Sequence, residues 1–377
     1  MTDCRPSYDV AVIGGGPAGS VAALEIARLG RPVALIARDE PDNEKVGETI
    51  APSIRPLLDR LGVLQEFLDE KFLPSYANRS VWASDQLLEH NFMGDPYGHG
   101  WHLDRRRFDR MLLDAAKRAG ADVLPETAVV DSGRAGAGWR LELRGPNGSS
   151  SISAEWAVDA TGRASWFARR VGVARRSDDK LVASTGFFGQ PPSRFEDTTT
   201  LVEAMPDGWW YSAPLPDGRL VAAYFTDPDL SPGEVLTSPE AWRRMMTSAT
   251  ETNKRAILHG GVPPEKMHVL SAGSSRLDAF TGRNWVAVGD AAFCYDPVSS
   301  GGISAAMGGG IDAAQAVDKA IEGDDDAIER YAKRLHQAYD RYLRLLAAYY
   351  RDEKRWVNRP FWKRRSSRPM FGEAPAA

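Results

Sequence analysis

A glycine-rich turn near the N-terminus constrains the fold more than any other feature of the sequence. The residues from Tyr8 to Ile13 are rich in valine and isoleucine without strict alternation, which predicts a strand buried on both faces. GGGPAGS follows at once, and the stretch from Ser20 to Gly30 has a helical period, ends on a glycine and precedes a second strand, PVALIA. Gly14, Gly16 and Gly19 match the pattern G-x-G-x-x-G. The complete strand, turn, helix and strand predict an α/β fold that binds a dinucleotide.

Each glycine of this pattern has its own physical task. The first permits the tight turn, the second lets the backbone approach a pyrophosphate, and the third lets helix and strand pack closely. The helix N-terminus supplies unpaired N–H groups and a positive dipole end for the phosphates. One position departs from the pattern, because Ala37 stands where an acidic residue usually binds a ribose hydroxyl, and Arg38, Asp39 and Glu40 follow it. Either a neighbouring carboxylate replaces that contact, or water and backbone hold the ribose, or Arg38 favours a phosphate.

Composition narrows the class of protein. With 43% hydrophobic and 26% charged residues among 377, the chain is an ordinary globular one. A net charge of -4 gives no field for nucleic acid or an anionic membrane, so neither is expected as a partner. Cys4 and Cys294 are too far apart in sequence to suggest a disulfide framework, and neither they nor the six histidines suggest a metal site. Without a signal peptide or an apolar stretch of about 18 residues, the expected location is the cytoplasm.

Two further motifs follow predicted strands. In RNWVAVGDAAFCYDPVSSGGISAAM, the strand from Trp285 to Val288 ends at Gly289-Asp290, and a helix begins near Gly301-Gly302-Ile303 with its N-terminus above Asp290. In EWAVDATGRAS, another strand ends at Asp159 before the chain turns.

In this order, and with the R-x-x-F-D pattern that begins at Arg105, the motifs resemble the FAD-dependent monooxygenases of the aromatic hydroxylase type, including the branch of flavin-dependent halogenases. The resemblance implies FAD as cofactor and a Rossmann-like FAD-binding domain interleaved with a β-sheet substrate domain. NAD(P)H or a separate flavin reductase would reduce the flavin, because no second glycine-rich turn of the nucleotide-binding kind is present. The residues expected to bind FAD are Gly14, Gly16, Pro17, Ala18, Gly19, Arg38, Arg105, Asp159, Gly289, Asp290, Gly301, Gly302 and Ile303.

Four segments resemble a narrower group, the maturation flavoproteins of the LodB and GoxB type. They are KVGETIAPS at 45–53, YGHGWHLDRRRFD at 97–109, GWWYSAPLPDG at 208–218 and KRWVNRPFWKRR at 354–365. That resemblance implies hydroxylation of a tryptophan within a partner protein, on the way to a tryptophan-derived quinone. The expected substrate is therefore an aromatic small molecule or a tryptophan-bearing peptide or protein.

Hydroxylation through a flavin hydroperoxide is favoured over halogenation. Halogenases of the tryptophan type carry W-x-W-x-I-P, where this chain has Trp209-Trp210-Tyr211-Ser212-Ala213-Pro214. Their essential lysine also has no counterpart in the stretch FLPSYANRSVWAS after Lys71. A reductase of the isoprenoid-reductase type and a non-enzymatic maturation module that keeps FAD for stability remain as alternatives.

Three residues are candidates for the chemistry: Glu48, Tyr211 and Ser300. Glu48 would act as an acid or base near the flavin, or would simply be a helix-start carboxylate beside Thr49. Alternation along WWYSAP places Tyr211 and Trp209 on one face of a strand, before a hairpin at Asp217-Gly218. Ser300, with Ser299, would serve a proton relay or only permit close backbone approach.

Other side chains have two interpretations each. His102 would touch substrate or flavin, or be structural. Cys294 would be a reactive thiol or flavin attachment point, or a small buried residue. The aromatic side chains that would either stack on a substrate or belong to the core are Trp82, Trp101, Trp209, Trp210 and Tyr211.

The nucleotide motifs recur along the chain, which predicts two interleaved domains. Residues 1–72, 101–183 and 271–325 would form the FAD-binding domain, 73–100 and 184–270 the substrate domain, and 326–377 a C-terminal helix and basic tail. The helix would have Asp326 as N-cap and Glu329 in its first turn. Its expected apolar positions, suited to coiled-coil pairing or to docking on the body, are Ile328, Tyr331, Leu335, Ala338, Tyr342, Leu345 and Tyr349. The tail would meet an acidic partner or pack with solvated charges; it contains Arg355, Trp356, Arg359, Phe361, Trp362, Lys363, Arg364, Arg365 and Arg368.

Overall fold

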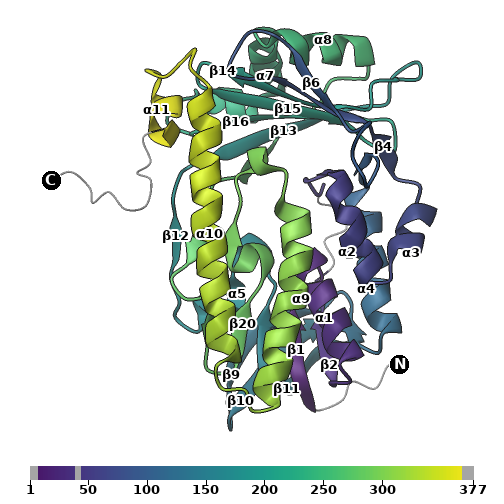
Figure 1. Ribbon diagram of the computed structural model, residues 1–377, viewed down its shortest axis with the longest axis vertical. Helices are drawn as coiled ribbons and strands as arrows, with labels where there is room; N and C mark the ends of the chain where they lie inside the picture. The colour runs from purple at the N-terminus through teal and green to yellow at the C-terminus, as the bar shows by residue number, and fades with distance from the viewer. Residues whose placement is uncertain (1–6, 39–43, 367–377) are drawn as a thin grey trace, which may run out of the picture.

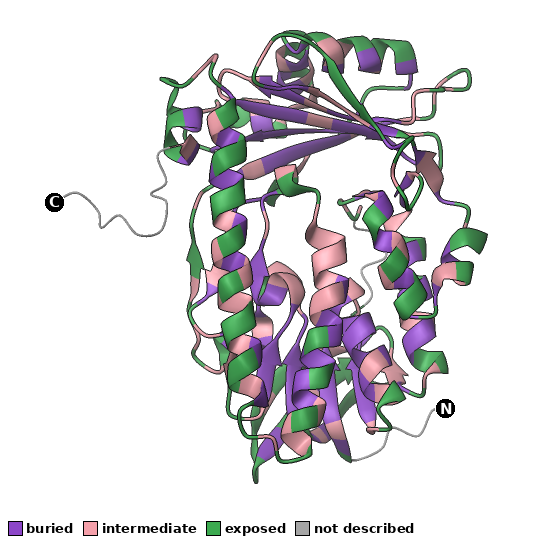
Figure 2. Ribbon diagram, in the orientation of Figure 1, coloured by how far each residue is buried: buried purple, intermediate pink, exposed green. Residues whose placement is uncertain are grey.

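Two large β-sheets lie toward opposite ends of the long axis, with helices between and beside them (Figure 1). This is a computed structural model, and it describes residues 7–38 and 44–366 of the 377-residue chain. Most strands of both sheets are buried, whereas the long helices have one exposed face (Figure 2).

The first sheet has eight strands and a parallel centre, in the order β19-β20-β11-β1-β2-β8, with β10 and β9 added beside β11. Its strands are β1 (Ser7–Ile13), β2 (Val33–Ile36), β8 (Asp122–Leu124), β9 (Ala128–Ala135), β10 (Gly138–Gly145), β11 (Gly148–Asp159), β19 (Thr281–Gly282) and β20 (Trp285–Ala287). Val10 and Val12 contribute to the core on one face of β1, and Ala11 and Ile13 to the core on the other. The prediction of a strand buried on both faces is therefore confirmed, as is the α/β fold class.

Helices cover this first sheet on the side of Val10 and Val12. They are α1 (Pro17–Arg28), α4 (Arg105–Arg118) and α9 (Gly302–Ile321), with the short α2 (Arg55–Arg60) and α3 (Leu64–Asp69) beside them. The opposite face packs on Trp139 of β10 and Phe167 of α5 (Trp166–Arg170), whose rings meet edge to face. Helices α1 and α9 lie side by side (Figure 1).

The second sheet has seven strands in the order β17-β13-β16-β15-β14-β5-β6 and is antiparallel except between β14 and β5. Its strands are β5 (Ala77–Val81), β6 (Leu88–Asn91), β13 (Val182–Phe188), β14 (Thr200–Met205), β15 (Gly208–Pro214), β16 (Leu220–Thr226) and β17 (His268–Ser271). The predicted hairpin at Asp217-Gly218 joins β15 to β16, with Gly218 at φ 85°.

Side chains alternate along β15 as predicted. Trp209 and Tyr211 face the core shared with the first sheet, and Trp209 stacks on Phe225 with ring centroids 3.9 Å apart. Trp210 points to the other face, against Trp242. The helices on that outer side are α6 (Gly233–Thr237), α7 (Pro239–Met246) and α8 (Thr250–His259).

Two small sheets connect the large ones. The first contains β3 (Thr49–Ile50), β4 (Leu73–Ser75) and β7 (Gly100–His102), and the second contains β12 (Arg175–Ser177), β18 (Ser275–Leu277) and β21 (Phe293–Cys294). Because β3 and β7 pair antiparallel, Thr49 stands directly opposite His102. The boundaries of the two predicted domains, 1–72, 101–183 and 271–325 against 73–100 and 184–270, stay a prediction.

The C-terminal helix α10 (Ala327–Asp352) runs along the molecule and docks on it, and α11 (Pro360–Ser366) follows at the second sheet (Figure 1). Tyr331, Tyr339, Tyr342, Leu346 and Tyr350 are buried. Two expected apolar positions were wrong, since Leu345 and Tyr349 are 66% and 37% exposed. Asp326 occupies the N-cap position but its side chain caps nothing.

The basic tail is a packed end of the chain. Its arginines form ion pairs with carboxylates of the body: Arg355 with Asp85 and Glu353, Arg359 with Asp207, Arg364 with Asp227 and Asp229, and Arg365 with Asp227. Arg368 lies outside the described residues. Within residues 7–38 and 44–366, no helix is both long and apolar enough to span a bilayer.

Candidate functional site

The glycine-rich turn has the geometry that its sequence predicts. Gly14 has φ +117°, and a Cβ there would lie 2.2 Å from the carbonyl oxygen of Ala160. At Gly19 a Cβ would lie 1.9 Å from the carbonyl oxygen of Gly14. Around Gly16, by contrast, nothing lies within 4 Å of a Cβ. The outer two glycines are thus required by the protein's own packing, and the middle one leaves room for a ligand at the start of α1, where Pro17 is the first helical residue.

The second nucleotide motif meets the first in space. Gly289 has φ +59°, and a Cβ there would lie 2.8 Å from the Cβ of Ala18, so the turn after β20 sits against the first turn of α1. Asp290 is exposed by 41% of its side chain, with an oxygen 3.8 Å from Nε of Arg163. The loop then reaches Gly301 and the N-terminus of α9, where a Cβ at Gly302 would meet nothing. Gly301, Gly302 and Ile303 are half-buried.

Asp159 and Arg38 have less direct places in this arrangement. The carboxylate of Asp159 is fully buried and accepts hydrogen bonds from the N–H and hydroxyl of Thr161 at 3.0 and 2.6 Å and from the N–H of Ala168 at 2.8 Å. It therefore holds the turn after β11, and a direct contact with the cofactor stays a prediction. Arg38 is exposed just after β2, while Asp39 and Glu40 lie outside the described residues.

Arg105 fixes the segment that carries Glu48. Its Nη1 donates to the carbonyl oxygens of Val46 and Gly47 at 2.7 and 3.1 Å, and its Nη2 lies 3.3 Å from Asp109. Its Nε is buried and finds no hydrogen-bond partner among the described residues. Such an orphaned donor is costly unless a ligand pairs with it.

Glu48 and Tyr211 are brought together although they are 163 positions apart in sequence. The Glu48 side chain is 4% exposed, and its Oε2 lies 3.5 Å from the Tyr211 hydroxyl. Its Oε1 is buried without a partner within the described chain. Burial raises the pKa of Glu48 above its ordinary value, and burial beside Glu48 raises the pKa of Tyr211 as well.

Thr49 is a residue that sequence reasoning missed as a member of the site. Its hydroxyl lies 2.8 Å from the hydroxyl of Tyr211 and 3.0 Å from Nδ1 of His102. His102 is fully buried, which is typical of a structural histidine, yet the hydroxyl of Thr49 connects it to Tyr211. The sequence carries no signal for such a role of Thr49, because the contact depends on the pairing of β3 with β7.

Ser300 lies apart from this pair. It is exposed, follows the 3-10 turn Pro297–Ser299, and has φ 49°. None of its hydrogen bonds within the described chain reaches Glu48 or Tyr211, so its catalytic role stays a prediction. Cys294 is fully buried, with its Sγ 2.7 Å from an Arg175 nitrogen, and burial raises the pKa of its thiol to about 11. These features suit a small buried residue.

The aromatic candidates are mostly core residues: Trp82, Trp101, Trp209 and Trp210 are each at most 5% exposed. A cavity of about 580 Å³ lies on the outer face of the second sheet, where Met205, Trp210 and Tyr224 line it. Apart from the aromatic candidate Trp210, no residue expected to bind FAD or to take part in the chemistry borders that cavity. The open cradle at Gly16 and the orphaned atoms of Arg105 and Glu48 are therefore the features that fit a bound FAD.

Comparisons with known proteins agree with this geometry. The family model described as the FAD binding domain matches residues 7–345. A curated relative, named putative FAD-dependent oxidoreductase LodB, from Marinomonas mediterranea, is 31% identical over 362 residues, which cover 95% of this chain and 97% of the relative.

Two solved structures have the same fold. The flavin-dependent halogenase CmlS is 26% identical, with a TM-score of 0.81 over 96% of this chain and 68% of that one. The peptidyl tryptophan dihydroxylase QhpG, described as essential for tryptophylquinone cofactor biogenesis, is 24% identical, with a TM-score of 0.80 over 98% of this chain and 81% of that one. With a family model that spans most of the sequence, the chain belongs to the FAD binding domain family and is an FAD-dependent oxidoreductase of the aromatic monooxygenase and halogenase superfamily.

Proposed function

We propose that this protein hydroxylates an indole-like aromatic group, a tryptophan side chain within a peptide or protein. The observation that carries the proposal is the contact between the buried Glu48 and the half-buried Tyr211, which lies where the segment fixed by Arg105 meets the second sheet. One oxygen of Glu48 is buried and unpaired within the described chain, so a proton donor is held ready at this point. The name of QhpG, a peptidyl tryptophan dihydroxylase of the same fold, supports the choice of substrate.

The chemistry balances with molecular oxygen as the oxidant. Bound FAD, once reduced, activates oxygen, and this is chemistry that the cofactor supplies. One oxygen atom enters a C–H bond of the arene and the other leaves as water, so two electrons are needed, from NAD(P)H or from a separate flavin reductase. The protein must orient the ring, exclude water and provide a proton. We assign the donation of the proton to Glu48. A cytoplasmic location belongs to the same proposal.

The alternative function is halogenation, which the likeness to the halogenase CmlS favours. Against it, the residues between Lys71 and Ser84 contain no lysine, and Trp209-Trp210-Tyr211 departs from the tryptophan halogenase pattern. Halogenation would add a halogen atom where hydroxylation adds oxygen, so the two functions give products of different mass.

The test is mass spectrometry of products formed under oxygen-18 gas. Free tryptophan and a tryptophan-bearing peptide are each incubated with the FAD-loaded protein, NADH or NADPH, a flavin reductase and both chloride and bromide. We expect one labelled oxygen in the peptide product. A halogenated product would instead establish the alternative, and saturation of a double bond without label would indicate a reductase.

A pair of variants connects the product to the site. Glu48→Gln removes the proton donor, and we expect the rate of product formation to fall by about a hundredfold or more while the flavin absorbance stays. Glu142→Gln changes an exposed carboxylate on β10 and should leave the rate as it is. Equal rates in all three proteins would contradict the role of Glu48.

A further inference from the structure

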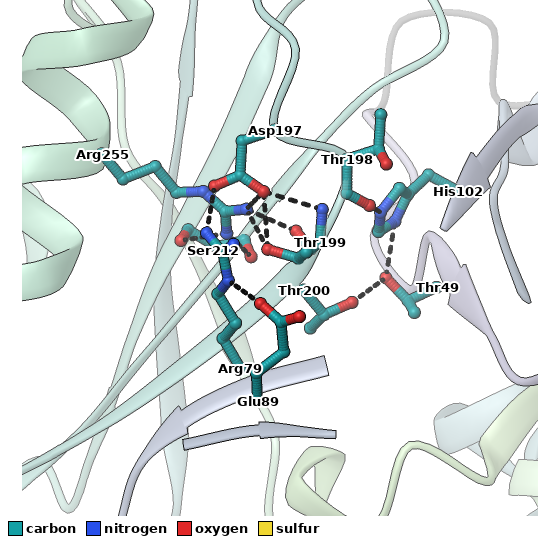
Figure 3. Close-up of polar contacts among 10 residues, drawn as sticks. All are labelled: Thr49, Arg79, Glu89, His102, Asp197, Thr198, Thr199, Thr200, Ser212 and Arg255. Carbon is teal, nitrogen blue, oxygen red and sulfur yellow. Dashed lines mark hydrogen bonds and ion pairs between the residues drawn. The ribbon is translucent and has the colours of Figure 1, made fainter. Parts of the chain in front are cut away.

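Thr49 joins three hydrogen-bonding partners through a single hydroxyl. Its Oγ1 lies 2.8 Å from the oxygen of Tyr211, 3.0 Å from Nδ1 of His102 and 3.4 Å from Oγ1 of Thr200 (Figure 3 shows the last two). A threonine hydroxyl has one hydrogen to donate and two lone pairs to accept with. The direction of any one of these bonds therefore limits the others.

The far end of this chain of contacts fixes its direction. Nε2 of His102 lies 2.8 Å from the carbonyl oxygen of Thr198, which can only accept (Figure 3), so Nε2 carries a hydrogen. Burial lowers the pKa of His102 to about 4, so the ring is neutral at physiological pH and Nδ1 has a free lone pair. Thr49 must then donate its hydrogen to Nδ1 of His102.

The residues on either side of Thr198 are held by side-chain contacts. Arg255, 4% exposed, donates to the carbonyl oxygens of Thr199 and Ser212 at 2.5 and 3.0 Å and lies 2.9 Å from Asp197. Asp197 in turn accepts from the N–H of Thr199 at 3.0 Å. Figure 3 shows this network beside Thr198, on the side away from His102, so the chain next to the acceptor is held by the ion pair of the buried Arg255 with the partly exposed Asp197.

The direction passes on to Tyr211 and Glu48. Because the hydrogen of Thr49 is already used, the 2.8 Å contact requires Tyr211 to donate to Thr49. At 3.5 Å from Oε2 of Glu48, the phenol would donate to an ionised carboxylate if its hydrogen were free. Because that hydrogen is used at the shorter contact with Thr49, the phenol can only accept from Glu48. A carboxyl group opposite an acceptor is favoured in its protonated form, which can donate, and disfavoured as an anion.

We propose that Thr49 and His102 are positioning residues that set the direction of the Tyr211 hydroxyl, so that Tyr211 accepts a hydrogen bond from Glu48 and keeps Glu48 in its acid form. The use of that proton in hydroxylation rests on the proposed function. The protonation of Glu48 in the resting protein does not, and it can be measured without turnover.

Charged groups lie at both ends of this chain of contacts. Arg105, which holds the carbonyl oxygens of Val46 and Gly47, favours the charged carboxylate of Glu48. Arg255 and Asp197 lie beyond His102 and oppose each other in their effect on its ring. Retention of the proton on Glu48 thus depends on burial and on the direction of the Tyr211 hydroxyl.

The experiment is an infrared pH titration of the full-length, FAD-loaded protein. The band of the protonated carboxyl of Glu48 is identified by its loss in Glu48→Gln. Thr49→Val keeps the shape of the side chain but frees the hydrogen of Tyr211 to turn toward Glu48. A hydrogen bond donated to the carboxylate stabilises the anion, so we expect the apparent pKa of Glu48 to fall by about one unit or more.

Matched variants distinguish a change in the direction of the Tyr211 hydroxyl from a general disturbance of the structure. Thr49→Ser keeps the hydroxyl, and Thr200→Val removes only a hydrogen donated to Thr49, so both should leave the pKa of Glu48 unchanged. His102→Phe should reproduce the fall, whereas in His102→Gln the amide can donate to Thr198 and accept from Thr49, which should restore the wild-type value. Flavin absorbance checks that each variant is folded.

An unchanged or raised pKa in a folded Thr49→Val protein would overturn the inference. The same holds if Thr200→Val lowers the pKa as much as Thr49→Val does. Failure of the proposed function would look different, because the titration would give the expected shifts while no oxygen-18 appeared in any product.

Discussion

At the scale of single residues, Glu48 is the point where burial and charge conflict most directly. Its side chain is 4% exposed and its pKa is raised. As pH rises from the ordinary range of a glutamate through this raised pKa, the unfolded chain has already lost the proton that the folded chain keeps. The free energy of unfolding therefore falls with rising pH in that window.

Replacing Glu48 by glutamine removes this fall in the free energy of unfolding, because the amide cannot ionise. We expect Glu48→Gln to be closest to wild type in stability below the ordinary glutamate pKa, and to gain on it steadily as pH rises. Urea midpoints at fixed FAD concentration, measured from acid to alkaline pH, check this. Glu142→Gln, whose carboxylate is 44% exposed, should show no such trend, and a margin for Glu48→Gln that shrinks with pH would contradict the assignment.

Sequence reasoning succeeded at residues whose task is local. Gly14, Gly16 and Gly19 act within one turn, so their spacing alone predicts their roles. Glu48 and Tyr211 were each proposed as candidates, but their contact spans 163 positions and depends on how two sheets meet. Thr49 had no signal at all, since its importance comes from three partners supplied by three other strands or loops.

At the scale of elements, the approach of α9 to α1 sets the spacing of two helices whose N-termini we expect to bind the cofactor. Gly310 of α9 faces α1 so closely that a Cβ there would lie 2.7 Å from the carbonyl oxygen of Ala18. Gly308, two residues earlier, would place a Cβ in open space. The N-termini of both helices belong to the nucleotide motifs, so a change in this contact is transmitted to the cofactor.

Alanine at these two glycines should have opposite effects. Gly310→Ala forces the helices apart, and we expect a loss of about 1–3 kcal/mol in the free energy of unfolding and weaker FAD retention. Gly308→Ala only improves helix propensity, so a gain of up to about 1 kcal/mol is expected. Thermal unfolding and FAD release are the measurements. A loss of equal size in both variants would indicate that helix α9 is sensitive to any substitution.

The spacing of the buried residues along α10 explains why the sequence predicted this helix but not every residue of its buried face. The expected positions followed an alternation of three and four, a period of 3.5 residues, which suits a supercoil. A straight helix docked on a globular body has 3.6 residues per turn, so its buried stripe drifts along the sequence. Between Ile328 and Tyr349 the drift amounts to about 0.6 residue. Leu346 and Tyr350 are accordingly buried where Leu345 and Tyr349 were expected.

At the scale of the whole molecule, the C-terminal segment ties the two large sheets together. Tyr331 of α10 donates to the carbonyl oxygen of Ala287 in the first sheet, 2.8 Å away. Arg365 of α11 lies 2.6 Å from Asp227, just after the last residue of β16 in the second sheet. Both charged side chains are at most 3% exposed, so the pair is a buried one.

Breaking this buried pair should be costly. Arg365→Met leaves Asp227 with an unpaired side of its carboxylate in the interior, and we expect a loss of about 3–5 kcal/mol in the free energy of unfolding. Arg359→Met breaks an exposed pair with Asp207 and should cost at most about 1 kcal/mol. Denaturant unfolding compares the two. The double variant Arg365→Met with Asp227→Leu should recover much of the loss, and failure to do so would indicate that packing rather than charge is at fault.

The same segment also holds the loop before α9. The buried N–H of Asp296 donates to the hydroxyl of Tyr342 at 2.6 Å, and Tyr350 donates to the carboxylate of Asp296 at 2.8 Å. Both tyrosines are synthesised after every nucleotide motif, so a nascent chain in which Tyr342 and Tyr350 are still inside the ribosome has the sequence of those motifs but not these contacts. The loop before α9 can therefore take up these contacts only after the chain has been made beyond Tyr350, so the nucleotide motifs alone do not complete this region during synthesis.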